Sequence, residues 1–189
     1  MPVMRQVRFH GRGGQGAVSA AALLSMAAFE NGFESQAFPK FGSERRGAPV
    51  EAYVRISDAP IRSHNQVYTP DAVVILDATL LRAEPVLQGL REGGLALINA
   101  DAAPALRTEP TGCRWLAVPA DRISVAQLGR PFPNTALLGA LAAATGWVDL
   151  PALETVVRRQ LGGKGEHVVS ANLALLRQGF ELGQDRRES

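Results

Sequence analysis

The residues with the clearest chemical meaning are the glycines of the sequence GRGGQG, which occupies positions 11–16. Gly11, Gly13 and Gly16 fit the pattern G-x-G-x-x-G, in which the first glycine permits a tight turn and the second lets a ligand approach the backbone. The third glycine lets a helix pack closely on a strand. Gly14 adds a fourth position without a Cβ. Backbone N–H groups at a helix start favour anions such as a diphosphate, so this loop is a candidate phosphate site. The same glycines also suit a sharp turn that packs against a neighbouring chain.

An NAD site would need an acidic residue at the end of the second strand, about 20 residues beyond the glycines, to bind the ribose hydroxyls. That strand is expected at residues 33–38, and Glu34 stands at its beginning instead of its end. Lys40 follows the strand and suits a nucleotide that carries a further phosphate. An ordinary NAD site is therefore disfavoured, and the rest of the sequence has no evident proton-transfer pair.

A second group of charged residues lies in the sequence PKFGSERRGAP, at positions 39–49. Lys40, Arg45 and Arg46 suit the phosphates of coenzyme A or a substrate carboxylate, because arginine offers a planar, bidentate fork. Without other information, the same residues fit a solvated loop or salt bridges across a subunit interface.

The cysteine and histidine content limits metal chemistry. Cys113 is the single cysteine, whereas an iron–sulfur cluster or a structural zinc needs about four protein ligands. His10, His64 and His167 are far apart in the sequence and have no clustered carboxylates nearby, so structural or surface roles are favoured. We expect no metal site in this chain, and any cluster must lie on other chains. The formal charge of +2 gives no indication of nucleic-acid binding.

The elements around these loops alternate in type. Strands are expected at residues 6–10, 33–38, 50–57, 71–79, 93–100 and 113–120. Helices are expected at residues 17–31, 80–90, 122–128, 134–146, 150–161 and 170–183. This alternation predicts an α/β fold with a Rossmann-like, doubly wound, mostly parallel sheet and additional C-terminal helices.

The chain length predicts one domain. A chain of 189 residues with 46% hydrophobic content can bury one full-sized core but scarcely two. We therefore expect a single domain over 1–189, with a sheet core at 1–132 and helices at 133–189 packed on it. The first residues have no apolar stretch of signal-peptide length, and no run of about 18 apolar residues is present, so a cytoplasmic location is expected.

Taken together, GRGGQG, PKFGSERRGAP, VRIS and VVILD closely resemble the gamma subunit, or gamma domain, of the thiamine-diphosphate-dependent 2-oxoacid:acceptor oxidoreductases. This family includes pyruvate, 2-oxoglutarate, indolepyruvate and phenylglyoxylate enzymes. The likeness covers most of the chain, because NTALLGAL from Asn134 and NLALLRQG from Asn172 also look like the family's C-terminal region. One departure is Ala48, where many members carry a second glycine after the arginine.

The resemblance implies a subunit of a larger enzyme that oxidatively decarboxylates a 2-oxoacid and transfers the acyl group to coenzyme A. Electrons then pass through iron–sulfur clusters to ferredoxin or another acceptor. Thiamine diphosphate and the clusters are expected on partner subunits, and no catalytic residue is expected in this chain. The residues expected to bind coenzyme A are Gly11, Arg12, Gly13, Gly14, Gln15, Gly16, Lys40, Arg45 and Arg46.

Two alternatives remain open. The chain can instead be an assembly subunit whose glycine loop packs against its neighbour and binds no ligand. It can also be an independent nicotinamide-dependent dehydrogenase.

Overall fold

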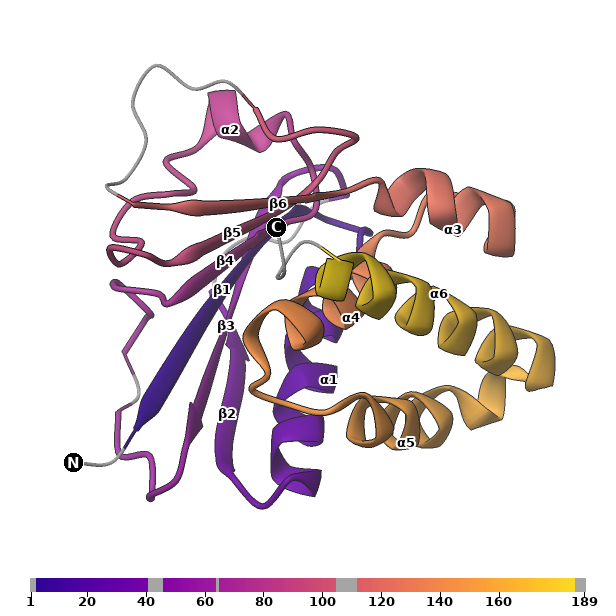
Figure 1. Cartoon of the computed structure of the whole chain (residues 1–189), viewed down its shortest axis with the longest axis horizontal. Coiled ribbons are helices and arrows are strands. Elements are labelled where there is room, and N and C mark those ends of the chain that lie inside the picture. Colours follow the sequence, from indigo (N-terminus) through magenta and orange to yellow (C-terminus); the bar gives the residue numbers. More distant parts are fainter. Residues whose placement is uncertain (1–2, 41–45, 64, 105–111, 186–189) are drawn as a thin grey trace.

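Six strands form one mixed sheet in the order β2-β3-β1-β4-β5-β6 (Figure 1). The computed structural model describes residues 3–40, 46–63, 65–104 and 112–185. The strands are β1 (Met4–Arg12), β2 (Glu34–Pro39), β3 (Pro49–Ser57), β4 (Ala72–Ile75), β5 (Leu95–Asn99) and β6 (Arg114–Val118). The strands β1, β4, β5 and β6 are parallel, whereas β3 is antiparallel to both of its neighbours, β1 and β2.

The long helices lie on one face of this sheet and the short α2 lies on the other (Figure 1). The helices are α1 (Ala17–Glu30), α2 (Leu80–Ala83), α3 (Ala120–Leu128), α4 (Asn134–Thr145), α5 (Leu150–Leu161) and α6 (Glu166–Asp185), with a 3-10 turn η1 (Gly162–Lys164) before α6. The expected α/β fold class is confirmed. In the described part of the chain, no helix is both long and apolar enough to cross a membrane.

Alternation along β1 divides its side chains between the two faces of the sheet. Val7 and Phe9 join the large apolar core under the long helices, which also contains residues of α1, α4, α5 and α6. Arg8 and His10 point to the opposite face, because successive side chains of a strand alternate. Both are buried polar residues. The face of β1 away from the long helices is therefore unusually polar for the centre of a sheet.

The helices α4 and α6 pack backbone to backbone at glycines. A Cβ on Gly179 of α6 would collide with the backbone oxygen of Ala136, and a Cβ on Gly139 of α4 would collide with that of Leu176. This close approach gives a structural reason for glycine within the segments that begin at Asn134 and Asn172.

Most predicted elements are present, but the strand predicted at residues 71–79 ends at Ile75 and the helix predicted at residues 80–90 ends at Ala83. The predicted helix at residues 80–90 is wrong beyond Ala83, because Glu84 has an extended backbone (φ −137°, ψ 149°). Glu84 precedes Pro85, and the residue before a proline is sterically biased away from helical geometry. The last helix begins at Glu166, four residues before its predicted start at Ser170. β1 continues through Gly11 to Arg12, two residues beyond its predicted end.

Candidate functional site

The glycine loop (residues 11–16) and the described end of the basic loop (residues 46–48 of the segment 39–49) lie side by side at the carboxyl edge of β1. The backbone N–H of Gly13 donates to the oxygen of Ala48 at 2.9 Å, and the N–H of Gly47 donates to the oxygen of Gly13 at 3.2 Å. Gly13 and Arg46 form a parallel β-bridge. Two segments that the sequence marks separately thus form one site.

A groove of about 650 Å³ lies between this pair of loops and the start of α1. Its lining residues are Arg12, Gly13, Gly14, Gly16, Ala17, Val18, Ser19, Arg46, Val50 and Phe132. Val18, Val50 and Phe132 give it apolar walls, and Arg46 is exposed to solvent. In the described part of the chain, no carboxylate forms an ion pair with Arg46.

The start of α1 presents backbone donors to the groove. Gly16 is the N-cap residue, and no side chain caps the helix. Ala20 is the first helical residue whose N–H is bonded, to the oxygen of Gly16. Among the residues that the structure describes, none accepts a hydrogen bond from the backbone N–H of Ala17, Val18 or Ser19. These free donors and the positive end of the helix dipole favour an anion in the groove.

Gly16 is required by both conformation and space. Its φ of +83° lies in the left-handed region that disfavours other residues. An added Cβ would also lie 2.6 Å from Nδ2 of Asn134, at the beginning of α4. The last glycine of the motif therefore packs the loop against a helix more than 100 positions away, a contact that sequence reasoning missed.

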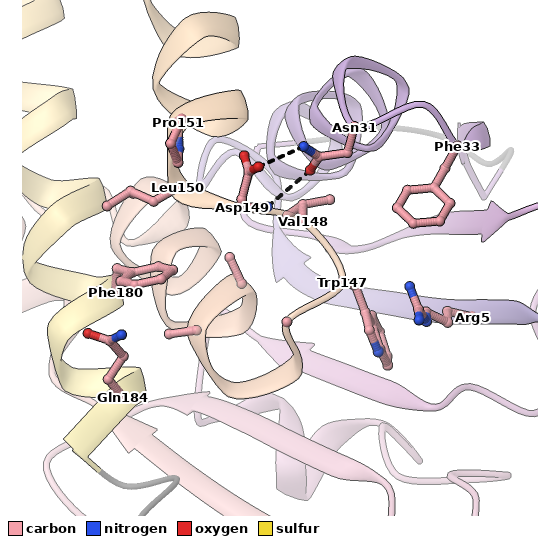
Figure 2. A pocket seen from close by; sticks show the side chains of 13 residues that line it. Arg5, Asn31, Phe33, Trp147, Val148, Asp149, Leu150, Pro151, Phe180 and Gln184 are labelled. Atoms are coloured by element: carbon pink, nitrogen blue, oxygen red, sulfur yellow. Dashed lines mark hydrogen bonds between the residues drawn. The ribbon is translucent and has the colours of Figure 1, made fainter.

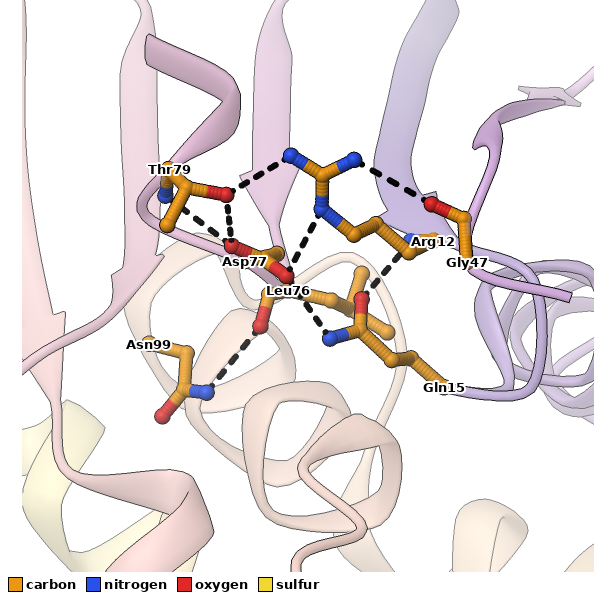
Figure 3. A network of polar contacts seen from close by, with 7 residues as sticks. All are labelled: Arg12, Gln15, Gly47, Leu76, Asp77, Thr79 and Asn99. Atoms are coloured by element: carbon orange, nitrogen blue, oxygen red, sulfur yellow. Dashed lines mark hydrogen bonds and ion pairs between the residues drawn. The ribbon is translucent and has the colours of Figure 1, made fainter. Parts of the chain in front are cut away.

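Arg12 connects the glycine loop to two other segments (Figure 3). Its Nε lies 3.2 Å from Oδ2 of Asp77, its Nη2 donates to Oγ1 of Thr79 at 2.9 Å, and its Nη1 donates to the oxygen of Gly47 at 3.1 Å. Gln15 adds to this network by accepting from the N–H of Arg12 at 2.7 Å and donating to Asp77 at 3.0 Å. The side chains of Arg12 and Gln15 thus bind other parts of this chain and stabilise the positions of the loops.

Asp77 is ionised at the centre of this network. Partial burial alone would raise the pKa of Asp77, but hydrogen bonds from Thr79 and Gln15 and the charge of Arg12 outweigh it, so the pKa is lowered. The network lies where the chain connections from β1 and β4 leave in opposite directions, the position at which open α/β sheets bind ligands. Asp77 was not among the predicted site residues, although it directly follows the apolar run VVIL.

Several of the residues predicted to bind coenzyme A are not among the described residues that line the groove. Gly11 is buried within β1. Lys40 does not line the groove, and its Nζ lies 2.9 Å from Oε1 of Glu51 in a separate pocket. Arg45 lies outside the described residues. The groove thus brings together Arg12, Gly13, Gly14, Gly16 and Arg46, with Gln15 behind them.

A metal site requires several ligating side chains that lie close together. Within residues 3–40, 46–63, 65–104 and 112–185, no group of three or more His, Cys, Asp or Glu side chains could hold a metal ion. Cys113 is partly buried and is the only cysteine of the sequence. The single cysteine also cannot supply the thiolate ligands of an iron–sulfur cluster.

A larger pocket of about 810 Å³ lies elsewhere, between the end of α1, the α4–α5 connection and α6 (Figure 2). Its polar residues Asn31 and Asp149 bond to each other, with Asn31 Nδ2 donating to Oδ2 of Asp149 at 2.9 Å. The guanidinium of Arg5 lies over the ring of Phe33, with Cζ 5.6 Å from the ring centroid. Because these groups already have partners, the pocket is a weaker candidate than the groove.

Comparison with known proteins gives a consistent result. Residues 6–182 match the pyruvate ferredoxin/flavodoxin oxidoreductase family. The chain is similar to pyruvate synthase subunit PorC of Methanosarcina barkeri, with 47% identity over 155 residues, or 82% of this chain and 85% of that protein. It is also similar to the common gamma subunit of the pyruvate/ketoisovalerate oxidoreductases of Pyrococcus abyssi, with 44% identity over 187 residues, covering 96% of this chain and 98% of that protein.

A solved structure has the same fold. Pyruvate oxidoreductase subunit PORC from Thermotoga maritima superimposes with a TM-score of 0.81 and 37% sequence identity. The match covers 94% of this chain and 96% of that subunit.

Proposed function

The chain belongs to the pyruvate ferredoxin/flavodoxin oxidoreductase family as a gamma subunit, and we propose that in the assembled enzyme it binds the phosphates of coenzyme A. The observation that carries this proposal is the junction of the two loops. It places the cation of Arg46 beside the glycine loop, on the same groove as the first N–H groups of α1, and neither has a partner among the described residues. Both kinds of group bind phosphate oxygens.

The groove has the mixed chemistry that a coenzyme A molecule needs. Backbone N–H groups at Ala17–Ser19 suit a diphosphate, and the guanidinium of Arg46 suits a further phosphate. The apolar side chains of Val50 and Phe132 offer contact surface for the uncharged parts of the molecule. When bound, coenzyme A supplies the thiol that accepts the acyl group. The residues of this chain bind and orient it.

The remaining chemistry belongs to partner subunits in this proposal. They hold thiamine diphosphate and the iron–sulfur clusters, oxidise the 2-oxoacid and pass electrons to ferredoxin or another acceptor. The single cysteine and the lack of a metal-ligand group among the described side chains support this division. We propose the cytoplasm as the place of assembly.

Two observations bear on the alternative functions. A pure assembly role would leave Arg46 and the first N–H groups of α1 without a use that the structure explains. A nicotinamide-dependent dehydrogenase would need an acid at the end of β2. Glu34 is instead at its start, and β2 is separated from β1 by β3.

Replacing Arg46 with alanine in the assembled enzyme tests the proposal. We expect the KM for coenzyme A to rise about 5- to 10-fold, because an exposed charge-assisted hydrogen bond contributes about 1 kcal/mol. The KM for the 2-oxoacid stays the same. Arg62→Ala is the matched control, because Arg62 is an exposed arginine that does not line the groove. An Arg46→Ala enzyme with an unaltered KM for coenzyme A would refute the assignment.

A further inference from the structure

A second polar pocket lies on the face of the sheet opposite to the long helices. It has a volume of about 420 Å³ and lies between the outer side of β1 and β3 and the segments 66–68 and 84–89. Its floor is formed by Arg8, His10 and Tyr53, which are almost fully buried, and Lys40 and Glu51 also line it. None of these five residues lines the groove at the glycine loop.

Arg8 places a buried positive charge at the floor of the pocket. Its Nη2 donates to the backbone oxygens of Val86 and Gln88 at 2.8 and 2.7 Å, and its Nε donates to Nε2 of His10 at 2.8 Å. All of these acceptors are neutral. Among the described residues, Arg8 has no carboxylate within ion-pair distance, although its side chain is only 7% exposed. Buried charges in proteins are normally paired, so an anionic ligand beside Arg8 would stabilise it.

His10 adds a fixed hydrogen-bond donor. Burial, together with the charge of Arg8, lowers the pKa of His10 from 6.5 to about 4, so the imidazole is neutral at pH 7. Because Nε2 accepts from Arg8, the single ring proton is on Nδ1. In the described part of the chain, no acceptor bonds to this Nδ1–H, and His10 is only 4% exposed. The neutral imidazole therefore keeps this donor available to a ligand oxygen in the pocket.

The charge of Glu51 acts on Arg8, but the two side chains form no ion pair. Oε1 of Glu51 is paired with the Lys40 ammonium at 2.9 Å, and its Oε2 accepts a hydrogen bond from the Tyr53 hydroxyl at 2.7 Å. The ammonium of Lys40 is exposed and has two further N–H donors. Lys40 and Glu51 thus form an ion pair, whereas Arg8 and Glu84, which also line the pocket, have no ion pair among the described residues.

We propose that this pocket binds a small-molecule carboxylate, whose two oxygens accept hydrogen bonds from Nδ1 of His10 and from Lys40 near the guanidinium of Arg8. A carboxylate provides one negative charge and acceptor sites on both oxygens, which matches one buried cation without an ion pair and two donors. Val67 and Pro85 line the pocket and can contact a short carbon chain. Glu84 also lines it and limits the ligand to a single acid group through charge repulsion.

NMR titration of the full chain tests this inference, with ¹⁵N-labelled histidine and with pyruvate and acetate as separate probes. We expect a saturable shift of the His10 Nδ1 signal, with His167 as the internal reference. Lys40→Gln should weaken pyruvate binding about tenfold. Glu84→Gln should strengthen it about threefold, because it removes a like charge.

Two further measurements separate this site from the coenzyme A groove. Arg46→Ala should leave pyruvate binding unchanged, and Lys40→Gln should leave coenzyme A binding unchanged. The inference is overturned if neither pyruvate nor acetate gives a saturable shift at concentrations up to about 100 mM. It is also overturned if Lys40→Gln does not change pyruvate binding. Equal binding of inorganic phosphate would overturn the assignment to carboxylates.

Discussion

At the scale of single residues, the structure distinguishes cations that are already paired from one that is free. Arg12 is paired with Asp77 and Lys40 with Glu51, whereas Arg46 has no ion-pair partner among the described residues. The sequence predicted all of these cations as phosphate ligands because their type and loop position are alike. It did not predict their pairing, which depends on carboxylates that only the folded sheet brings near.

Asp77 should stabilise the folded loops. We expect Asp77→Asn to lower the free energy of unfolding by about 1–2 kcal/mol at pH 7, because it removes the carboxylate that accepts from Arg12 and Gln15. Urea denaturation measures this difference. Asp101→Asn is the control, since Asp101 is a highly exposed carboxylate. Equal destabilisation by the two variants would contradict the bracing role of Asp77.

His10 should make stability depend on pH. Its folded pKa of about 4 lies below the unfolded value near 6.5, so the unfolded chain binds more protons in this interval. The contribution of His10 to the free energy of unfolding is fully present above about pH 6.5. It is lost as the pH falls towards 4, which lowers the free energy of unfolding by up to about 3 kcal/mol. The nearby charges are Arg8, Lys40 and Glu51.

Comparing the wild-type chain with His10→Gln isolates this contribution, because glutamine can accept the Arg8 hydrogen bond but does not titrate. Urea unfolding between pH 7 and 4 should show a shallower loss of stability in the variant. Identical pH slopes would show that His10 titrates normally in the folded chain.

At the scale of elements, apolar runs in the sequence predicted the central strands β4 and β5, whose residues are almost all buried. The helix predicted at residues 80–90 was wrong beyond Ala83. The segment is rich in helix-forming residues, but Pro85 restricts the backbone of Glu84 to an extended conformation. The position of β3 between β1 and β2 could not be predicted, since strand order depends on pairing between distant segments. That insertion is what brings the basic loop to the glycine loop.

The backbone contact between α4 and α6 should be intolerant of any side chain at Gly179. We expect Gly179→Ala to lower the free energy of unfolding by about 3 kcal/mol, because its Cβ would collide with the rigid backbone of Ala136. Gly163→Ala serves as the control, because no atom lies within 4 Å of an added Cβ there. Similar denaturation midpoints for the two variants would contradict this packing.

At the scale of the whole molecule, one apolar core contains residues of the sheet and of the C-terminal helices. The sequence led us to expect one domain with a sheet core at 1–132 and helices at 133–189, and we propose that the two parts unfold as one unit. The candidate site also contains a contact between the two parts, because Asn134 of the C-terminal part packs on Gly16 of the glycine loop. Contacts of this range carry no local signal in the sequence.

The two tryptophans provide a test of this cooperativity. Trp115 lies in β6 and Trp147 precedes α5, so each reports on one of the two parts. Each of the variants Trp115→Phe and Trp147→Phe keeps one tryptophan, whose fluorescence reports on one part of the chain. In urea, we expect the fluorescence transition of each variant to coincide with the circular dichroism transition of the same variant. Separate transitions for the two probes would show that the helices unfold independently.

The central claim is that this gamma subunit contributes the phosphate site for coenzyme A. The most direct test is an experimental structure of the assembled enzyme with coenzyme A bound. We expect phosphate oxygens within hydrogen-bond distance of the N–H groups of Ala17–Ser19 and of the Arg46 guanidinium. A coenzyme A molecule bound entirely by partner subunits, without contact to these residues, would contradict the claim.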